Sequence, residues 1–299
     1  MKKFSGENKL KKVKDVLIVF NDKKKHIKKI VGDLMNVLEE RNISYFIVPP
    51  AHLELKNHEI ITDFDDRYKH KDYQLIFAIG GDGTFLYTAR TFHPFKIPLV
   101  GINAGRLGFL MEIKPSHIKD AIDRILNDHV EFIERMILDI RVTRNGKDIC
   151  QFSALNEVVI SRGAFSRMVD IDVNIDKIHF SKYRADGVIV STPTGSTAYN
   201  LSAGGPILTP KTEAFIITPI CPHTLGVRPI IIHSDKVLEF EVVTPELESD
   251  LTIDGQEKTG VCVGDKITIK KSENSVVMYY FGDYNFYNTL REKLGWQKC

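Results

Sequence analysis

Residues 75–86 read Leu-Ile-Phe-Ala-Ile-Gly-Gly-Asp-Gly-Thr-Phe-Leu, and this stretch decides the fold of the first half of the chain. Its apolar run predicts a buried strand, and Thr84 is the expected start of a helix. Glycines at positions 80, 81 and 83 permit positive φ and let a ligand approach the backbone closely. Amide N–H groups beside a helix N-terminus suit an oligophosphate. The one charged residue of the turn, Asp82, indicates chemistry or a metal ion beside the phosphates.

The segments on either side alternate between strand and helix patterns. Short apolar runs predict strands at 16–20, 43–48, 75–79 and 98–102, the second of them ended by Pro49-Pro50. Apolar residues at helical spacing predict helices at about 27–41 and 116–126. The alternation predicts an α/β domain with a parallel sheet over residues 1–136, with ligands at the carboxyl ends of its strands.

The pattern changes near residue 137. Apolar and polar residues alternate over 138–142, 169–175, 237–242 and 267–269, and Asn145-Gly146 is typical of a tight hairpin turn. We therefore expect a mainly antiparallel, β-sandwich-like domain over residues 137–284. Residues 286–294 have a helical pattern, and we expect the segment 285–299 to pack back on the first domain.

A second motif, at residues 192–200, reads Thr-Pro-Thr-Gly-Ser-Thr-Ala-Tyr-Asn and follows a predicted strand at 188–190. A hydroxyl of Ser196 or Thr197 is suited to cap a short helix there. The N–H groups and hydroxyls of such a helix start, with Tyr199, suit a ligand that has both phosphates and a flat ring. A hydroxyl-rich turn with an ordinary cap has the same pattern, so the motif alone does not decide between the two.

Asn156 and Glu157 stand at the start of another predicted strand. Asparagine can pair with an amide-bearing ring edge or a ribose, and glutamate can accept hydrogen bonds from ribose hydroxyls. Considered without the other motifs, this pair is more typical of a structural role.

The composition excludes several classes of protein. The 299 residues carry a formal net charge of +2, so no global field favours nucleic acid. Lysines are dense at 2–14 and 23–29, which is typical of a solvated terminus, with attraction of an anionic ligand or partner as the alternative. We expect neither a secretory signal nor a membrane span, because no apolar run reaches about 18 residues. Four scattered cysteines predict a reduced, cytoplasmic protein.

Taken together, the motifs resemble the NAD kinase family in order and spacing, over about residues 16–281. The resemblance is carried by Gly80 to Thr84, Asn156-Glu157, Asp186-Gly187, residues 192–200 and Ile253-Asp254-Gly255-Gln256. Lipid kinases of the diacylglycerol and sphingosine type and the 6-phosphofructokinases have similar glycine-aspartate turns, whereas the segment 192–200 separates NAD kinases from them. Ala185 departs from the glycine that bacterial members more often have before the aspartate, and we expect little effect.

The resemblance implies that ATP or polyphosphate phosphorylates the adenosine-ribose 2′-hydroxyl of NAD, giving NADP. It implies that Asp82 is the catalytic residue, which takes the hydroxyl proton. We expect Mg²⁺ or another divalent cation to arrive with the donor, because the donor phosphates need their charge offset and the sequence has no dedicated carboxylate cluster. A homo-oligomer, dimer or tetramer, is implied as well. The expected binding residues are Gly80, Gly81 and Gly83 at phosphates, Asn156 and Glu157 at adenosine or ribose, Thr197 and Tyr199 at adenine, and Asp186 and Ala198 at nicotinamide, together with Thr84, Arg184, Thr194 and Ser202.

Several individual roles stay open. Asp82 could instead cap the helix that follows it, Arg184 could form a surface ion pair, and Asn103 could contact ligand or occupy a left-handed turn position. His223 could face the donor phosphates or pack within its loop, and Asp254 could face the ligand or make a plain hairpin turn. The rival functions are a lipid kinase of the diacylglycerol type and a dinucleotide-binding sensor without catalysis.

Overall fold

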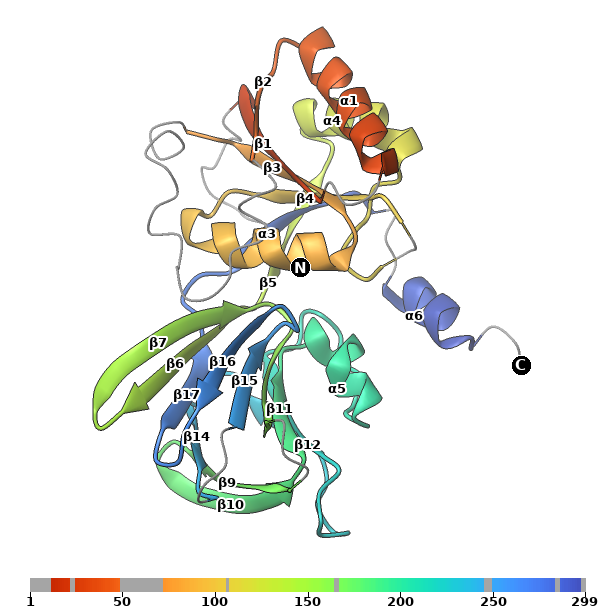
Figure 1. Cartoon of the computed structure of the whole chain (residues 1–299). Helices are drawn as coiled ribbons and strands as arrows, with labels where there is room; N and C mark the ends of the chain where they lie inside the picture. Colours follow the sequence, from red (N-terminus) through yellow and green to blue (C-terminus); the bar gives the residue numbers. More distant parts are fainter. Residues whose placement is uncertain are drawn as a thin grey trace. The chain divides into compact units, whose positions relative to one another are not determined.

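The computed structural model describes residues 12–21, 25–48, 72–105, 108–163, 167–244, 249–282 and 286–296 (Figure 1). They form two compact units. The first contains the described residues up to Ile133 together with residues 277–296, and the second runs from Glu134 to Val276. Most of the lysine-rich N-terminus, Pro49-Pro50 and Arg106-Leu107 lie outside the described residues.

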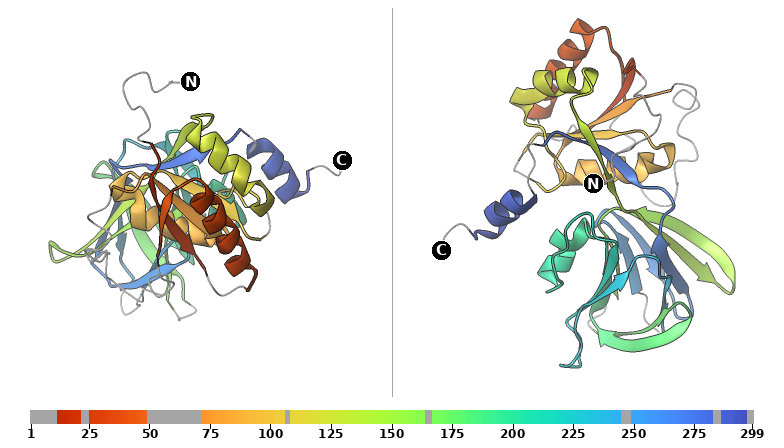
Figure 2. Two further views of the ribbon diagram at one scale, coloured as in Figure 1. Left: turned by 90° about the horizontal axis from the view of Figure 1, so that it is seen from above. Right: turned by 180° about the vertical axis from the view of Figure 1, so that it is seen from behind.

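The first unit is an α/β domain built on a sheet with the order β2-β1-β3-β4-β18-β5. From β2 to β18, each strand pairs in parallel with its neighbour. Helices α1 and α4 cover one face of this sheet and α3 covers the other (Figures 1 and 2). The elements are β1 (Asp15–Phe20), α1 (Lys25–Glu40), β2 (Ser44–Ile47), β3 (Leu75–Gly80), α3 (Asp82–Phe92), η2 (His93–Phe95), β4 (Leu99–Asn103), η3 (Pro115–His117), α4 (Ile118–Leu126), β5 (Glu131–Arg135), β18 (Val276–Tyr280) and α6 (Phe286–Leu294).

The helical pattern of α1 and the strand patterns meet in one apolar core. Ile27, Leu34 and Leu38 recur on one side of α1 and are almost completely buried. They belong to the same cluster as Val16 of β1 and Phe77 of β3. Burying such side chains stabilises the fold by about 1.5–3 kcal/mol each, which is why the apolar spacing predicts these elements correctly.

Two features of this domain differ from the expectation. Helix α3 begins at Asp82, two residues before Thr84, because Gly81 has an extended backbone (φ −119°, ψ −175°) and serves as its N-cap. Strand β18, which lies in the segment assigned to the second domain, pairs in parallel with β4, with Met278 opposite Leu99. A short apolar strand has the same pattern in either sheet, so its periodicity could not place it.

The predicted C-terminal helix is present as α6. The ring of Phe286 at its start lies 6.2 Å, between centroids, from the ring of Phe109. Both residues belong to the first unit.

The second unit is antiparallel, as predicted, with the sheets β10-β9-β14-β17-β6-β7 and β13-β12-β11-β8-β15-β16. Alternate residues of the two sheets form one buried cluster, which includes Val142, Phe240, Ile160 and Val190. The strands are β6 (Leu138–Arg144), β7 (Lys147–Ala154), β8 (Glu157–Arg162), β9 (Val169–Ile175), β10 (Ile178–Ala185), β11 (Gly187–Ser191), β12 (Ala214–Ile220), β13 (Ile230–His233), β14 (Leu238–Val242), β15 (Ser249–Ile253), β16 (Glu257–Val261) and β17 (Lys266–Lys271).

The hairpin predicted at Asn145-Gly146 joins β6 to β7. Both residues have positive φ, 51° and 74°, which is the backbone that a two-residue turn between twisted strands requires. None of the described helices has the combination of length and apolar character needed to cross a bilayer.

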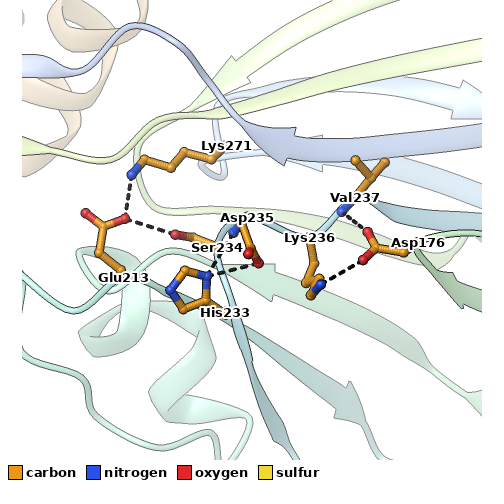
Figure 3. A network of polar contacts seen from close by, with 8 residues as sticks. All are labelled: Asp176, Glu213, His233, Ser234, Asp235, Lys236, Val237 and Lys271. Atoms are coloured by element: carbon orange, nitrogen blue, oxygen red, sulfur yellow. Dashed lines mark hydrogen bonds and ion pairs between the residues drawn. The ribbon is translucent and has the colours of Figure 1, made fainter.

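A polar network connects the two sheets of the second unit where the chain passes from β13 to β14 (Figure 3). Glu213, before β12, accepts hydrogen bonds from Ser234 Oγ and from Lys271 Nζ at the end of β17. The lysine lowers the pKa of the Glu213 carboxyl. In the turn between β9 and β10, Asp176 accepts the Val237 N–H at 3.0 Å and pairs with Lys236 Nζ at 2.9 Å, as Figure 3 also shows.

Candidate active site

The glycine turn between β3 and α3 is held by backbone contacts. The Gly80 carbonyl accepts the Ala104 N–H at 2.8 Å, and the Gly81 carbonyl accepts the Thr84 N–H at 2.9 Å. A Cβ at Gly80 would lie 2.3 Å from Thr84 Oγ1, whereas a Cβ at Gly81 would meet nothing within 4 Å. Gly80 is therefore required for packing, and Gly81 offers an open backbone for a ligand. None of the three glycines has positive φ, so the turn uses their lack of a side chain and not the conformational freedom that glycine permits.

Asp82 is fixed from a distant part of the chain. Its Oδ2 accepts the Phe109 N–H at 3.1 Å and its Oδ1 accepts the Leu110 N–H at 3.3 Å. A Cβ at Gly108 would lie 2.0 Å from Asp82 Oδ1, so only glycine fits there. These two bonds go to the loop after β4 and not to the helix that Asp82 begins, unlike the helix cap considered as an alternative. The half-buried carboxylate is held in one orientation with acceptor capacity left over.

Asn103, at the end of β4, makes a local turn. Its Oδ1 accepts the Gly105 N–H at 2.8 Å. The residue is buried and does not have positive φ, so the left-handed alternative was wrong.

In the second unit, Asp254 organises the start of β8. Its carboxylate accepts the N–H groups of Leu155, Asn156 and Glu157 at 2.8–3.0 Å. Asp254 sits with φ 48° in the turn between β15 and β16, so the predicted hairpin turn is present, and its side chain is 6% exposed. The three donors are 97–99 residues away in sequence, which explains why no local pattern revealed this role.

Glu157 and Thr194 each bury a polar atom that has no hydrogen-bond partner in the structure: Glu157 Oε2 and Thr194 Oγ1. Burial, together with the neighbouring Asp254 charge, raises the pKa of Glu157 to about 8, although a hydrogen bond from the Tyr199 backbone opposes the shift. An unpaired buried polar atom costs about 1–3 kcal/mol, so both atoms are suited to receive a ligand.

The segment 192–200 packs directly on Asn156. The Asn156 carbonyl accepts the Thr192 N–H at 2.8 Å, and a Cβ at Gly195 would lie 2.2 Å from the same carbonyl oxygen. Thr192 Oγ1 donates to the Leu155 carbonyl at 2.6 Å and accepts the Gly195 N–H at 3.1 Å. These contacts bring the Asn-Glu pair and the hydroxyl-rich motif together.

The expected cap at Ser196 or Thr197 was wrong. The segment forms a 3₁₀ turn, η4 (Gly195–Thr197), followed by α5 (Tyr199–Ser202), and neither start has a side-chain cap. Ser196 is completely buried, and its Oγ instead bonds to the Pro193 and Leu208 carbonyls.

The remaining predicted residues differ in exposure. Tyr199 is 46% exposed, which leaves its ring accessible. Asp186 pairs with Arg162 Nε at 2.9 Å, a partner that no motif had indicated.

Arg184 and His223 are exposed, and the His223 N–H donates a hydrogen bond to the Arg184 carbonyl. His223 is therefore not packed within its loop. Thr197 and Ala198 are half-buried, and Ser202 is exposed.

The first unit has a glycine turn with a fixed carboxylate, Asp82, at the end of a parallel strand. The second unit has a buried carboxyl group, Glu157, and a buried hydroxyl, Thr194. These features are typical of a two-domain nucleotide-binding protein. Family profiles agree: "ATP-NAD kinase N-terminal domain" matches residues 16–130, and "ATP-NAD kinase C-terminal domain" matches residues 155–281. The chain belongs to the NAD kinase family.

Relatives in bacteria support the same family. The NAD kinase of Carboxydothermus hydrogenoformans is 43% identical over 234 residues, covering 78% of this chain and 83% of the relative. The NAD kinase of Treponema denticola is 37% identical over 286 residues, covering 95% and 97%. The resemblance inferred from the motifs is confirmed, and the lipid-kinase alternative finds no support.

Solved structures share the fold. A yeast NADH kinase, described as complexed with NADH, has a TM-score of 0.82 at 23% identity, covering 97% of this chain and 89% of that one. An NAD kinase from Archaeoglobus fulgidus, described as in complex with ATP, has a TM-score of 0.69 at 24% identity, covering 94% and 97%.

Proposed function

We propose that this protein is an NAD kinase that transfers a phosphoryl group from ATP, or from polyphosphate, to the adenosine-ribose 2′-hydroxyl of NAD. Asp82 carries this proposal: it is the charged residue of a glycine turn suited to phosphates, and two backbone N–H groups fix its orientation. Family membership and relatives named NAD kinase support the same activity.

In the proposed reaction, Asp82 accepts the proton of the 2′-hydroxyl as the hydroxyl oxygen attacks the terminal phosphorus. The bond from that phosphorus to its bridging oxygen breaks, and the shortened donor leaves with the bonding electrons. Such transfers depend mainly on positioning and charge stabilisation. A carboxylate acting as general base typically contributes about 10²–10⁴ in rate.

Mg²⁺ would neutralise the charge of the donor phosphates. The described residues contain no group of three or more His, Cys, Asp or Glu side chains placed to hold a metal ion. Mg²⁺ usually keeps several waters and binds through one or two carboxylates plus substrate phosphates. The single carboxylate of Asp82 fits that arrangement, in which the ion arrives with the donor.

The second unit supplies the proposed NAD site. Glu157 Oε2 and Thr194 Oγ1 are buried without a partner in the structure, and Tyr199 offers an accessible ring. We assign adenosine or ribose to Asn156 and Glu157, with the remaining predicted residues along the same segment. A homo-oligomer and a cytoplasmic location complete the proposal; the free thiols of Cys150, Cys221 and Cys262 are compatible with a reducing compartment.

The test is NADP formation from NAD, Mg²⁺ and either ATP or polyphosphate, detected by an NADP-specific dehydrogenase. Asp82→Asn should lower kcat at least about 10²-fold while NAD affinity is largely kept. Asp120→Asn is the matched control, because Asp120 also lies in the first turn of a helix but is 71% exposed. An unaffected Asp82→Asn variant would refute the catalytic role and favour a dinucleotide sensor.

A further inference from the structure

Two buried carboxyl groups interact at the start of β8. Glu157 is 5% exposed and Asp254 is 6% exposed, and the charge of Asp254 acts on Glu157 and raises its pKa. Two such groups cannot both ionise at low cost, because like charges repel strongly where water is excluded. One of them therefore retains a proton over a wide range of pH.

The hydrogen bonds decide which group holds the charge. Asp254 accepts three backbone N–H groups, from Leu155, Asn156 and Glu157. Glu157 receives one, from the Tyr199 backbone, and its Oε2 has no partner in the structure. N–H donors stabilise the ionised form of a carboxyl group, so Asp254 is the better site for the charge and Glu157 for the proton.

Among the described residues, no positively charged side chain contributes to the pKa shift of Glu157. Its charged neighbour is Asp254 of the β15–β16 turn. From the segment 195–202, the titratable group is the Tyr199 phenol, on a side chain that is 46% exposed. Glu257, further along the hairpin, is exposed to solvent.

We propose that Asp254 is a positioning residue that carries the negative charge of this pair, while Glu157 stays neutral and donates a hydrogen bond from its carboxyl group to an acceptor atom of the dinucleotide. The inference rests on the proposed function, because it takes NAD as the ligand. It replaces the expectation that Glu157 accepts hydrogen bonds from ribose hydroxyls. A neutral Glu157 also avoids a second buried negative charge beside Asp254.

The sign of the pH dependence of NAD affinity tests this assignment. We would titrate the full-length protein with NAD by calorimetry between pH 6 and 9, without a phosphoryl donor. Since the pKa of Glu157 is raised to about 8, affinity should fall roughly tenfold between pH 7 and pH 9. Glu157→Gln, whose amide also donates, should bind within about threefold of wild type at pH 7 and lose this fall. Affinity that rises with pH, or an unchanged fall in Glu157→Gln, would overturn the proposal.

Two variants of the β15–β16 hairpin distinguish the effect of the Asp254 charge from a general loss of structure. Asp254→Asn removes the repelling charge, so Glu157 should ionise more easily and the fall in affinity should move to lower pH. Asp250→Asn is the control, because Asp250 lies on β15 and pairs with Lys258 at 2.9 Å, away from Glu157. Its pH profile should match wild type. An Asp254→Asn profile that also matches wild type would contradict the positioning role.

A ligand-free measurement distinguishes this inference from the proposed function. At pH 7 the infrared spectrum should contain a protonated carboxyl band that Glu157→Gln removes, whether or not NADP is formed. Absence of that band would overturn the neutral state of Glu157. NAD binding with the expected profile but no NADP formation would refute the kinase activity and leave the proposal standing. Failure to bind NAD at any pH would overturn the donor role of Glu157 together with the proposed function.

Discussion

Replacing Glu157 by glutamine should remove a pH dependence from the stability of the protein. The folded state raises the pKa of this carboxyl from its ordinary 4.5 to about 8, because burial and the Asp254 charge both disfavour the ionised form. Between these two pH values the folded chain holds a proton that the unfolded chain has released. The free energy of unfolding therefore falls as pH rises through this window.

The size of the effect follows from the same shift. Each pH unit inside the window removes about 1.4 kcal/mol, so the three units from pH 5 to pH 8 correspond to about 4 kcal/mol. Glutamine does not titrate, so the stability of Glu157→Gln relative to wild type should rise by that amount over the same range. Ordinary carboxyl groups are already ionised at pH 5, and histidines titrate alike in both proteins.

Urea unfolding followed by circular dichroism, at half-unit steps from pH 5 to pH 8.5, measures this difference. Asp250→Asn should run parallel to wild type, because the Asp250 carboxylate pairs with Lys258, whose side chain is 63% exposed, and not with Glu157. A constant difference between Glu157→Gln and wild type across the range would refute the reasoning. So would a difference that falls with pH, since it would mean that Glu157 is stabilised as a carboxylate in the folded state.

Three further substitutions test other parts of the structure. Gly108→Ala should lower the kcat of NADP formation at least about tenfold, because the new Cβ would lie 2.0 Å from Asp82 Oδ1 and displace that carboxylate. Circular dichroism should show little loss of fold, and a wild-type kcat would contradict this prediction. Thr192→Val should destabilise by at least about 1–3 kcal/mol in urea unfolding, because the buried Gly195 N–H loses its acceptor, and an unchanged midpoint would count against that bond. Lys271→Met should change stability by less than about 1 kcal/mol, since its ion pair is exposed to solvent, and a larger loss would show that the network of Figure 3 acts as a unit.

The sequence by itself determined the element types and the family. Apolar periodicity predicted the strands and helices of both units because their buried faces repeat at the period of the local backbone. The glycine turn and the segment 192–200 were recognisable because close backbone packing accepts few residue types: Gly80 meets Thr84, and Gly195 meets the Asn156 carbonyl. The need for glycine at these two positions is visible in the motifs themselves, although Gly195 and Asn156 lie 39 residues apart.

Tertiary structure decided which groups meet across long separations. Asp82 is held by backbone N–H groups 27 and 28 residues away, and Asp254 holds Glu157 from 97 residues away. Backbone N–H groups have no residue identity, so no sequence pattern could name them as partners. The placement of β18 between β4 and β5 was equally undetermined, because the pattern of a short apolar strand does not specify which sheet the strand joins. Only the fold determines that Glu157 shares its burial with a second carboxyl group, and that proximity sets its charge.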